Sequence, residues 1–149
     1  MTTKRLVLAV VAAFVLSQIL AAVVHGFVLA TDYAPFEGTL LRRADGAPPW
    51  QMLFLPIVHL VFVSAMVWIY AHVRLAGPPL RRGLTLGLVA WTIGQVPTWL
   101  LWYAQQPWPG TLVVKQLLLE LIVSLALGIT IALVAGASSA ASERTVARV

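Results

Sequence analysis

Four polar side chains stand inside long apolar stretches of this sequence, and two of them are histidines. The sequence places His25 in "VVHGFVLATDY", His59 in "LPIVHLVF", Gln95 in "TIGQVPTW" and Glu120 in "LLLELIVS". Ionisable groups are costly inside a membrane, and they usually face the interior of a helix bundle and pair with one another. These four residues are therefore the candidates for chemistry.

Two kinds of cofactor suit this residue set. Two histidines and a carboxylate, here His25, His59 and Glu120, match the ligands of a catalytic zinc ion with water in the fourth position. Two neutral imidazoles, His25 and His59, could instead hold a b-type haem from both sides. His72 lies on the same stretch as His59, but a second haem would need a fourth histidine and the chain has three. The cofactor therefore stays open between haem b and a divalent metal.

Simpler uses of the same side chains are a proton relay, a small-molecule pocket, or packing between helices. Hydrogen bonds between polar side chains in a membrane hold helices together at about 0.6–2 kcal/mol each. The zinc-protease signature His-Glu-x-x-His is absent, and no Ser-His-Asp set or paired-carboxylate site can be assembled. We therefore assign no catalytic residue, and enzyme activity stays uncertain.

The elements that must position these side chains are membrane-spanning helices. Of the 149 residues, 60% are apolar and 10% are charged, whereas soluble domains carry about 25% charged residues. Four stretches reach the about 20 apolar residues that a helix needs to cross a membrane. They cover residues 6–30, 50–73, 83–104 and 111–135. The sequence therefore predicts an all-α protein, a four-helix transmembrane bundle forming a single integral membrane domain over residues 1–149.

Charges at the ends of these stretches indicate the orientation. One side of the membrane collects seven basic residues, Lys4, Arg5, Arg74, Arg81, Arg82, Arg144 and Arg148. The other side holds three, Arg42, Arg43 and Lys115, together with most of the interfacial aromatic residues. By the positive-inside rule, both termini are cytoplasmic. We expect a multi-pass protein of a bacterial inner (cytoplasmic) membrane, with a longer first outer loop and a mobile tail at about 137–149.

The four polar side chains fall at a similar depth. Because a helix rises about 1.5 Å per residue, His25 lies roughly 8–12 Å below the outer surface and His59 roughly 13 Å below it. Gln95 and Glu120 each lie nine residues from the outer end of their stretch. One residue from each span thus joins a polar layer in the outer half of the membrane.

Neighbouring residues fit around this polar layer. Gln116 and Ser124 lie four residues to either side of Glu120, on the same face of a helix. Pro97 should kink the third span, and Gly83 and Gly87 favour close approach of another helix. Asp32 and Tyr33, at the mouth of the bundle, could gate or cap the polar layer, but solvation in the loop is the expected role. Lys115 is expected to reach the outer surface.

Several short motifs resemble one group of proteins. They are "HGFVLATDY" (His25 to Tyr33), the paired arginines after it, Ile69-Tyr70, "GLTLGL" (Gly83 to Leu88) and the Pro-rich turn before "LLLELIVSLALG". This pattern resembles the small four-helix bacterial inner-membrane proteins of unknown function. The resemblance singles out His25, Gly26, Tyr33 and Glu120 without giving them a role.

Three classes of function follow as hypotheses. The small chain with little soluble part favours an accessory or assembly subunit of a larger membrane complex, with a membrane-protein partner or a second copy of itself. An electron-transfer or metal protein would use His25, His59 and Glu120. A carrier for a proton or a small solute would act as an oligomer, with Glu120 as the titrating group. The positive charge sits at helix ends, which favours lipid over nucleic acid as its partner.

Overall fold

The computed structural model describes residues 2–41 and 48–136, and within them the long elements are all helices. Four helices are long and apolar enough to span a membrane, and they cover Thr3–Val28, Trp50–His72, Pro79–Gln105 and Gly110–Gly136. This confirms the all-helical architecture and the four predicted candidate spans. The predicted tail at about 137–149, and with it Arg144 and Arg148, lies outside the described residues, as do Arg42 and Arg43.

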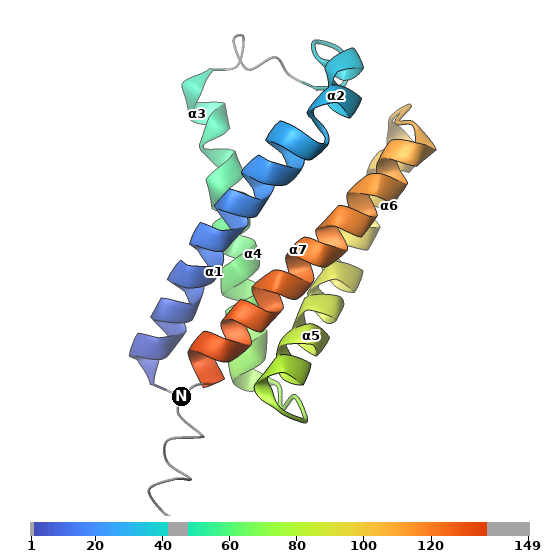
Figure 1. Cartoon of the computed structure of the whole chain (residues 1–149). Helices are drawn as coiled ribbons and strands as arrows, with labels where there is room; N and C mark the ends of the chain where they lie inside the picture. The colour runs from blue at the N-terminus through green and yellow to red at the C-terminus, as the bar shows by residue number, and fades with distance from the viewer. Residues whose placement is uncertain (1, 42–47, 137–149) are drawn as a thin grey trace, which may run out of the picture.

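Three of the four spans are built from more than one helical segment (Figure 1). The first consists of α1 (Thr3–Val23) and a π-helical turn, η1 (Val24–Val28), followed by two short segments, α2 (Ala30–Tyr33) and the 3-10 turn η2 (Ala34–Phe36). The second consists of α3 (Pro49–Met52) and α4 (Phe54–His72). The third consists of α5 (Pro79–Ala90), a second π-helical turn, η4 (Trp91–Gln95), and α6 (Val96–Gln105). The fourth is one continuous helix, α7 (Gly110–Gly136).

The third helix begins four residues earlier than the sequence predicts, at Pro79 and not at Gly83. Proline is well suited to the first turn of a helix, because its backbone lacks an N–H that would be unpaired there. The Pro78-Pro79 pair therefore ends the preceding turn and starts the helix at the same point.

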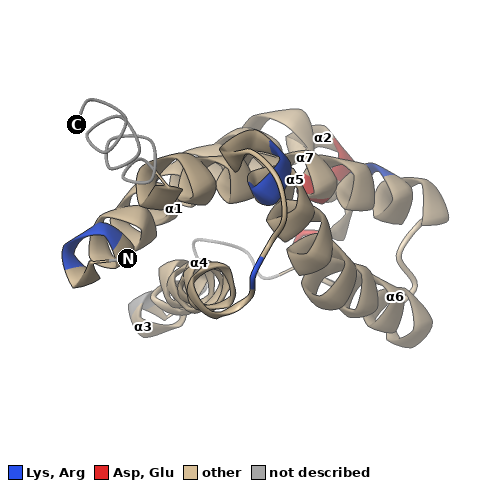
Figure 2. Cartoon of the chain, turned by 90° about the horizontal axis from the view of Figure 1, so that it is seen from below, with Lys and Arg blue, Asp and Glu red and all other residues tan. Residues whose placement is uncertain are grey.

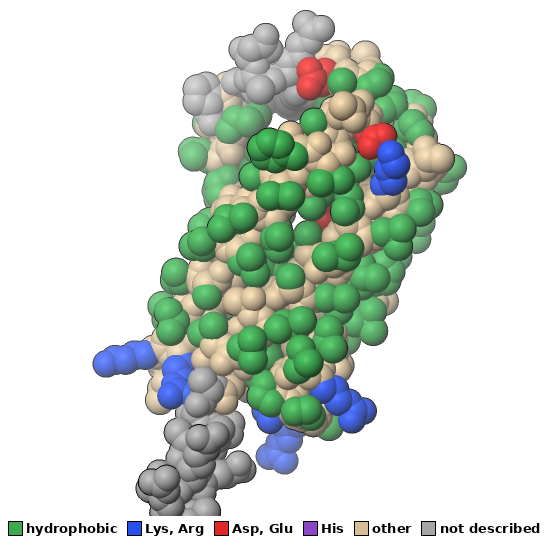
Figure 3. Space-filling model, viewed as in Figure 1, with side chains coloured by type: hydrophobic (Ala, Val, Ile, Leu, Met, Phe, Trp, Pro, Cys, Tyr) green, Lys and Arg blue, Asp and Glu red, His purple; other side chains and the backbone are tan. Residues whose placement is uncertain are grey.

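The two ends of the bundle carry different side chains. At one end α1 begins, α4 ends, α5 begins and α7 ends (Figures 1 and 3), and we call it the basic end. The segments at the basic end carry Lys4, Arg5, Arg74, Arg81 and Arg82. At the opposite end lie α2, α3 and the turn between α6 and α7, with Tyr33, Phe36, Trp50 and Trp108, and we call it the aromatic end.

The half of the bundle near the basic end is closed by a core to which all four spans contribute. Ala13 of α1, Met66 of α4, Leu86 of α5 and Ile131 of α7 are buried in this core. Small and branched side chains let the four helices meet without a central space. The hydroxyl of Tyr70, which donates to the carbonyl of Ala132 at 3.5 Å, is the one polar group on the side chains of this buried cluster as described, so the basic half is an apolar seal.

The core near the aromatic end lacks one of the spans. Its buried members are Val24, Leu29, Trp108, Leu112 and Val113, and the partly buried residues packed on them come from α2, η2, α6, α7 and the first loop. No residue of α4 takes part among the described residues. α4 and α6 lie apart in the view of Figure 2, and a cavity of about 620 Å³ is lined by residues of both helices at this end.

α5 and α7 pack backbone to backbone along three glycines. A side chain added at Gly83 would lie 2.6 Å from the Cα of Ile129, and one added at Gly87 would meet the backbone oxygen of Ser124. Gly128 faces them from α7. This confirms the close approach predicted from Gly83 and Gly87, with Gly128 as the partner.

The outward faces of the spans are apolar, as Figure 3 illustrates. On α1, for example, Val7, Val11, Val15 and Ile19 are each more than half exposed. A continuous band of exposed aliphatic side chains on every span is unfavourable in water and favourable in lipid tails. The chain is therefore a candidate multi-pass membrane protein in structure as well as in composition.

Candidate functional site

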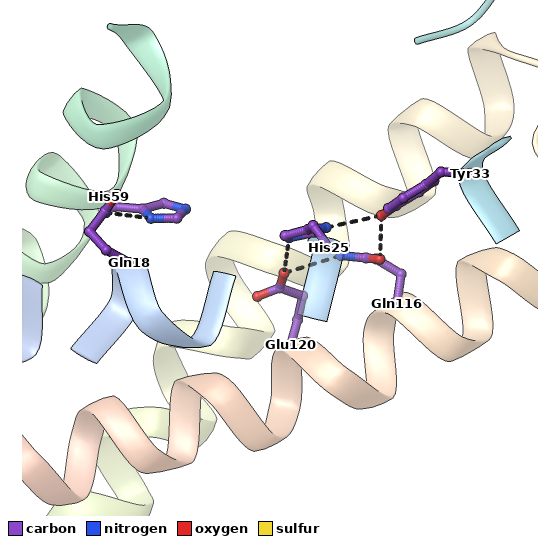
Figure 4. Close-up of polar contacts among 6 residues, drawn as sticks. All are labelled: Gln18, His25, Tyr33, His59, Gln116 and Glu120. Carbon is purple, nitrogen blue, oxygen red and sulfur yellow. Dashed lines mark hydrogen bonds and ion pairs between the residues drawn. The ribbon is translucent and has the colours of Figure 1, made fainter. Parts of the chain in front are cut away.

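A hydrogen-bonded cluster joins the first span, α2 and α7 at the open half of the bundle (Figure 4). The hydroxyl of Tyr33 donates to Oε1 of Gln116 at 2.7 Å, and Nε2 of Gln116 donates to Oε1 of Glu120 at 3.2 Å. Nδ1 of His25 lies 3.2 Å from the Tyr33 hydroxyl, and Nε2 of His25 lies 3.6 Å from Oε1 of Glu120. These four side chains form a closed ring of contacts, which we call the His25–Glu120 cluster.

The hydrogen bonds determine where protons lie in this cluster. Tyr33 has one hydroxyl proton and gives it to Gln116, so Nδ1 of His25 must carry a proton and donate it to the Tyr33 oxygen. Nε2 of His25 then faces a carboxylate oxygen of Glu120. Two lone pairs facing each other in a membrane are unfavourable, and a proton shared between Nε2 and Oε1 removes the repulsion. With one proton between them, His25 and Glu120 together have zero net charge.

His59 belongs to a second contact, which lies apart from the His25–Glu120 cluster (Figure 4). Nδ1 of His59, on α4, lies 2.8 Å from Nε2 of Gln18, on the neighbouring helix α1. Because an amide nitrogen can only donate, Nδ1 of His59 accepts, and the proton of the neutral ring is on Nε2. Gln18, which lies seven residues before His25, thus holds His59 in place. The Nε2–H of His59 remains available as a donor.

Three adjoining cavities surround these contacts, and His25 and His59 line all three. A small inner cavity of about 40 Å³ is also lined by Gln95 and Glu120, so one cavity collects the whole predicted polar layer. Its volume has room for a few water molecules.

The other two cavities are large and open-sided. The loop-side cavity, about 830 Å³, is lined by residues of the first span, the first loop, Leu55 of α4 and the tryptophans Trp99, Trp102 and Trp108. The α4–α6 cavity, about 620 Å³, lies between α4 and α6 and reaches Gln116 and Glu120. We refer to the two together as the cleft. The cleft has apolar and aromatic walls and a polar floor.

Both π-helical turns of the described residues lie at this site. η1 contains His25, and η4 contains Gln95. A π turn inserts one residue into a helix and shifts the direction of the side chains that follow, and such turns are frequent at functional sites. η4 ends two residues before Pro97, whose missing N–H predicts an interruption of the helix there. The indole of Trp91 donates to the carbonyl of Leu117 at 2.9 Å, and this bond ties η4 to α7.

Asp32 and Tyr33 differ from the sequence-based expectation of solvated loop residues. Nζ of Lys115 lies 2.8 and 3.0 Å from the two carboxylate oxygens of Asp32, so α2 is tied to α7. Lys115 is exposed at the aromatic end, as expected, and it is paired there with Asp32. Directly after Asp32 and Lys115 in the sequence, Tyr33 and Gln116 also pair, and the Tyr33 hydroxyl enters the His25–Glu120 cluster. Tyr33 and Gln116 are therefore site residues that depth reasoning missed, and the only signal for them was the "HGFVLATDY" resemblance and the four-residue spacing to Glu120.

Tyr33 lies outside the membrane-spanning segment, and its environment disfavours ionisation. Burial raises the pKa of Tyr33 well above its usual range, and the nearby charges of Glu120 and Asp32 raise it further. The phenol therefore stays protonated and keeps its hydrogen bond to Gln116 under all ordinary conditions.

An alkaline titration of phenolate absorbance should detect this raised pKa. In the folded protein, Tyr33 should ionise later than an ordinary phenol with a pKa of about 10. Because the folded state holds this proton more tightly than the unfolded state, stability is unaffected near neutral pH and falls as the pH rises above about 10. Tyr33→Phe should remove the late component, whereas Tyr103→Phe, at an exposed position, should leave it in place. A late component that persists in Tyr33→Phe would contradict the assignment.

The observed contacts do not assemble the three-residue metal set that the sequence suggests, and the haem hypothesis stays a prediction. Within residues 2–41 and 48–136, no group of three His, Cys, Asp or Glu side chains could hold a metal ion. His25 uses both ring nitrogens, toward Tyr33 and Glu120, and His59 uses Nδ1 toward Gln18. An axial haem ligand would need Nε2 of His25, which faces the carboxylate of Glu120. His72 is bound within its own helix, since its Nδ1 donates to the carbonyl of Trp68 at 2.8 Å.

Comparison with known proteins gives no match to this chain, whether against family models, curated proteins or solved structures.

Proposed function

We propose that this chain is a multi-pass membrane protein that binds a small amphipathic molecule in the cleft. The observation that carries the proposal is the hydrogen-bonded polar cluster at the floor of an open, aromatic-walled cavity. An amphipathic molecule would place its polar group against this floor and its apolar body between α4 and α6. This proposal is closest to the small-solute carrier among the three hypotheses from the sequence.

The dimensions and chemistry of the cleft support this reading. Small-molecule sites are concave, mostly apolar and about 300–1,000 Å³ in volume, with few polar groups, and the two large cavities of about 830 and 620 Å³ lie in that range. The polar floor also retains unused hydrogen-bonding capacity. Nε2–H of His59 is an available donor, and the amide of Gln95 has no hydrogen-bond partner among the described residues.

The route to the cleft is from the bilayer or from the aromatic end. α4 carries exposed apolar side chains beside the opening, including Leu55, Val58 and Val61, which favour contact with lipid tails. The apolar seal of the basic half closes the opposite route. A single chain therefore binds its ligand on one side, and transport across the membrane would require a second conformation or an oligomer.

A binding measurement with two probes of similar shape tests this proposal. The protein, in nanodiscs of zwitterionic lipid, is dialysed to equilibrium against methyltriphenylphosphonium or triphenylphosphine oxide. We expect saturable binding of at least one probe. Trp99→Ala combined with Trp102→Ala should weaken it about tenfold, because each aromatic contact contributes about 0.5–1.5 kcal/mol.

Matched variants separate the cleft from general damage. Trp68→Ala removes an exposed tryptophan of α4 that lines none of the three cavities and should leave binding unchanged. Gly26 lines the loop-side cavity, and a Cβ there meets nothing within 4 Å. Gly26→Ala should bind as the wild type does, and Gly26→Trp should block the cleft. Absence of saturable binding by both probes, or equal binding by Gly26→Trp and Gly26→Ala, would overturn the proposal.

We also propose the membrane placement that the sequence predicts, with the basic end in the cytoplasm of a bacterium. The gathering of Lys4, Arg5, Arg74, Arg81 and Arg82 at one end supports it through the positive-inside rule. The chain contains no cysteine, so single cysteines introduced at either end can be labelled selectively with impermeant reagents. Labelling of the basic end from outside the cell would reject this orientation. The accessory-subunit hypothesis stays a proposal as well, and it requires a partner that co-purifies at fixed stoichiometry.

A further inference from the structure

We infer that the molecule bound in the cleft is a lipophilic cation, and that it takes the place of the proton shared by His25 and Glu120. This inference rests on the proposed function. It adds the charge of the ligand and the exchange of that ligand for one proton. It starts from the charges that line the cleft.

The fixed charges lining the three cavities are all negative. Within the described residues, Glu37 lines the loop-side cavity, Glu120 lines the inner and α4–α6 cavities, and no lysine or arginine lines any of them. The nearest basic residue on α7, Lys115, is neutralised by Asp32. An anionic ligand would therefore meet no counter-charge in the cleft, whereas a cationic ligand would meet carboxylates.

The aromatic walls favour the same charge. Trp99 and Trp102 line both large cavities, and Trp108 and Tyr33 line the loop-side cavity. The electron-rich faces of tryptophan and tyrosine attract cations, and this attraction is stronger when the cation is desolvated. A bulky organic cation suits such walls better than a small hydrated ion, because its own apolar groups fill the cleft.

The shared proton couples ligand binding to pH. With the proton present, His25 and Glu120 together are neutral, and a cation would bring an unbalanced charge into a low-dielectric site. If the proton leaves to water at the aromatic end, Glu120 becomes the counter-ion of the ligand. His25 stays neutral and keeps its Nδ1–H bond to Tyr33. One positive charge enters and one leaves, so the net charge of the site is unchanged.

The other groups facing this pair do not replace it in that role. Gln116 of α7, Gln95 of η4 and Gln18 of α1 do not titrate, and Tyr33 of α2 stays protonated. His59 of α4 and Glu37 of the first loop are the remaining titratable side chains that line the cavities. Protonation of His59 at low pH would repel a cation in the same direction, so its contribution must be separated by a variant.

The test compares the two probes across pH in nanodiscs of zwitterionic lipid. Binding of methyltriphenylphosphonium should tighten by up to about tenfold per pH unit as the pair loses its proton, and binding of the neutral triphenylphosphine oxide should not change. Glu120→Gln should weaken cation binding at least about tenfold and remove the pH dependence of binding except for any part that His59 supplies. Cation binding should still depend on pH in Glu37→Gln, which removes a carboxylate away from the pair, and in His59→Gln.

Each outcome bears on a different claim. Equal binding of both probes, or unchanged cation binding in Glu120→Gln, would overturn the cation inference and leave the cleft as the binding site. The cation inference would also be overturned if the pH dependence of cation binding disappeared in His59→Gln and persisted in Glu120→Gln. Binding of neither probe would overturn the proposed function itself. The tryptophan emission spectrum of each variant checks that the bundle is folded.

Discussion

Replacing Gly128 by leucine should prevent α5 and α7 from packing and leave little folded protein. A Cβ at Gly128 would overlap the backbone oxygen of Gly83 and lie 2.7 Å from the backbone nitrogen of Gly87. Backbone atoms cannot rotate away as the end of a side chain can, so the helices must separate. Overpacking of a core costs about 1–3 kcal/mol when side chains can adjust, and we expect a larger loss here. Thermal unfolding in mild detergent and the yield of monodisperse protein measure it.

The control for this prediction is the same change at an open position. A Cβ at Gly26 has no neighbour within 4 Å, so Gly26→Leu should unfold close to the wild-type temperature even if it narrows the cleft. Similar losses for Gly128→Leu and Gly26→Leu would mean that the backbone contact between α5 and α7 does not limit stability. The comparison therefore isolates the helix seam from the general cost of adding leucine.

Replacing Gln116 by leucine should break the His25–Glu120 cluster and lower the free energy of unfolding strongly. Gln116 is fully buried, accepts from the Tyr33 hydroxyl and donates to Glu120. Leucine has a similar size but leaves the Tyr33 hydroxyl proton without its acceptor and Glu120 without its amide donor, at about 1–3 kcal/mol for each lost hydrogen bond in a buried site. α2 should also lose part of its attachment to α7. Thermal unfolding and proteolysis within the first loop are the measurements.

A glutamine at the surface provides the matched control for this change. Gln105 is the last residue of α6 and is exposed, so Gln105→Leu should change the unfolding temperature little. If Gln116→Leu is as stable as Gln105→Leu, the two hydrogen bonds of Gln116 do not contribute to the stability of the open half. The pairing of Tyr33 with His25 would then need another explanation.

The spans could be predicted because their signal is averaged over many residues. Twenty apolar side chains in a row indicate a membrane helix whatever their order, and proline and glycine at the turns set the ends to within a few residues. The position of His25, His59, Gln95 and Glu120 along their spans also follows from counting, since the rise of a helix is fixed. All four then line one small cavity.

The contacts between these residues could not be predicted in the same way. In a helix that is apolar on every face, the sequence carries little information about which face turns inward. The two π turns add a further change of direction at η1 and η4. Counting therefore could not separate the Gln18–His59 contact from the His25–Glu120 cluster, and it treated Tyr33 as a loop residue. Nor does local sequence indicate that α4 leaves the core of the aromatic end.

The apolar seal of the basic half also has an electrical consequence. A membrane potential falls mainly across the part of a protein that excludes water, and moving one charge across all of it changes its energy by about 2.3 kcal/mol per 100 mV. The cleft opens toward the aromatic end, whereas Met66, Leu86 and Ile131 fill the basic half. A charge that reaches Glu120 from the aromatic end therefore crosses little of the field. Occupancy of the cleft should be nearly independent of voltage, and any step that carries charge past the seal should depend on it steeply.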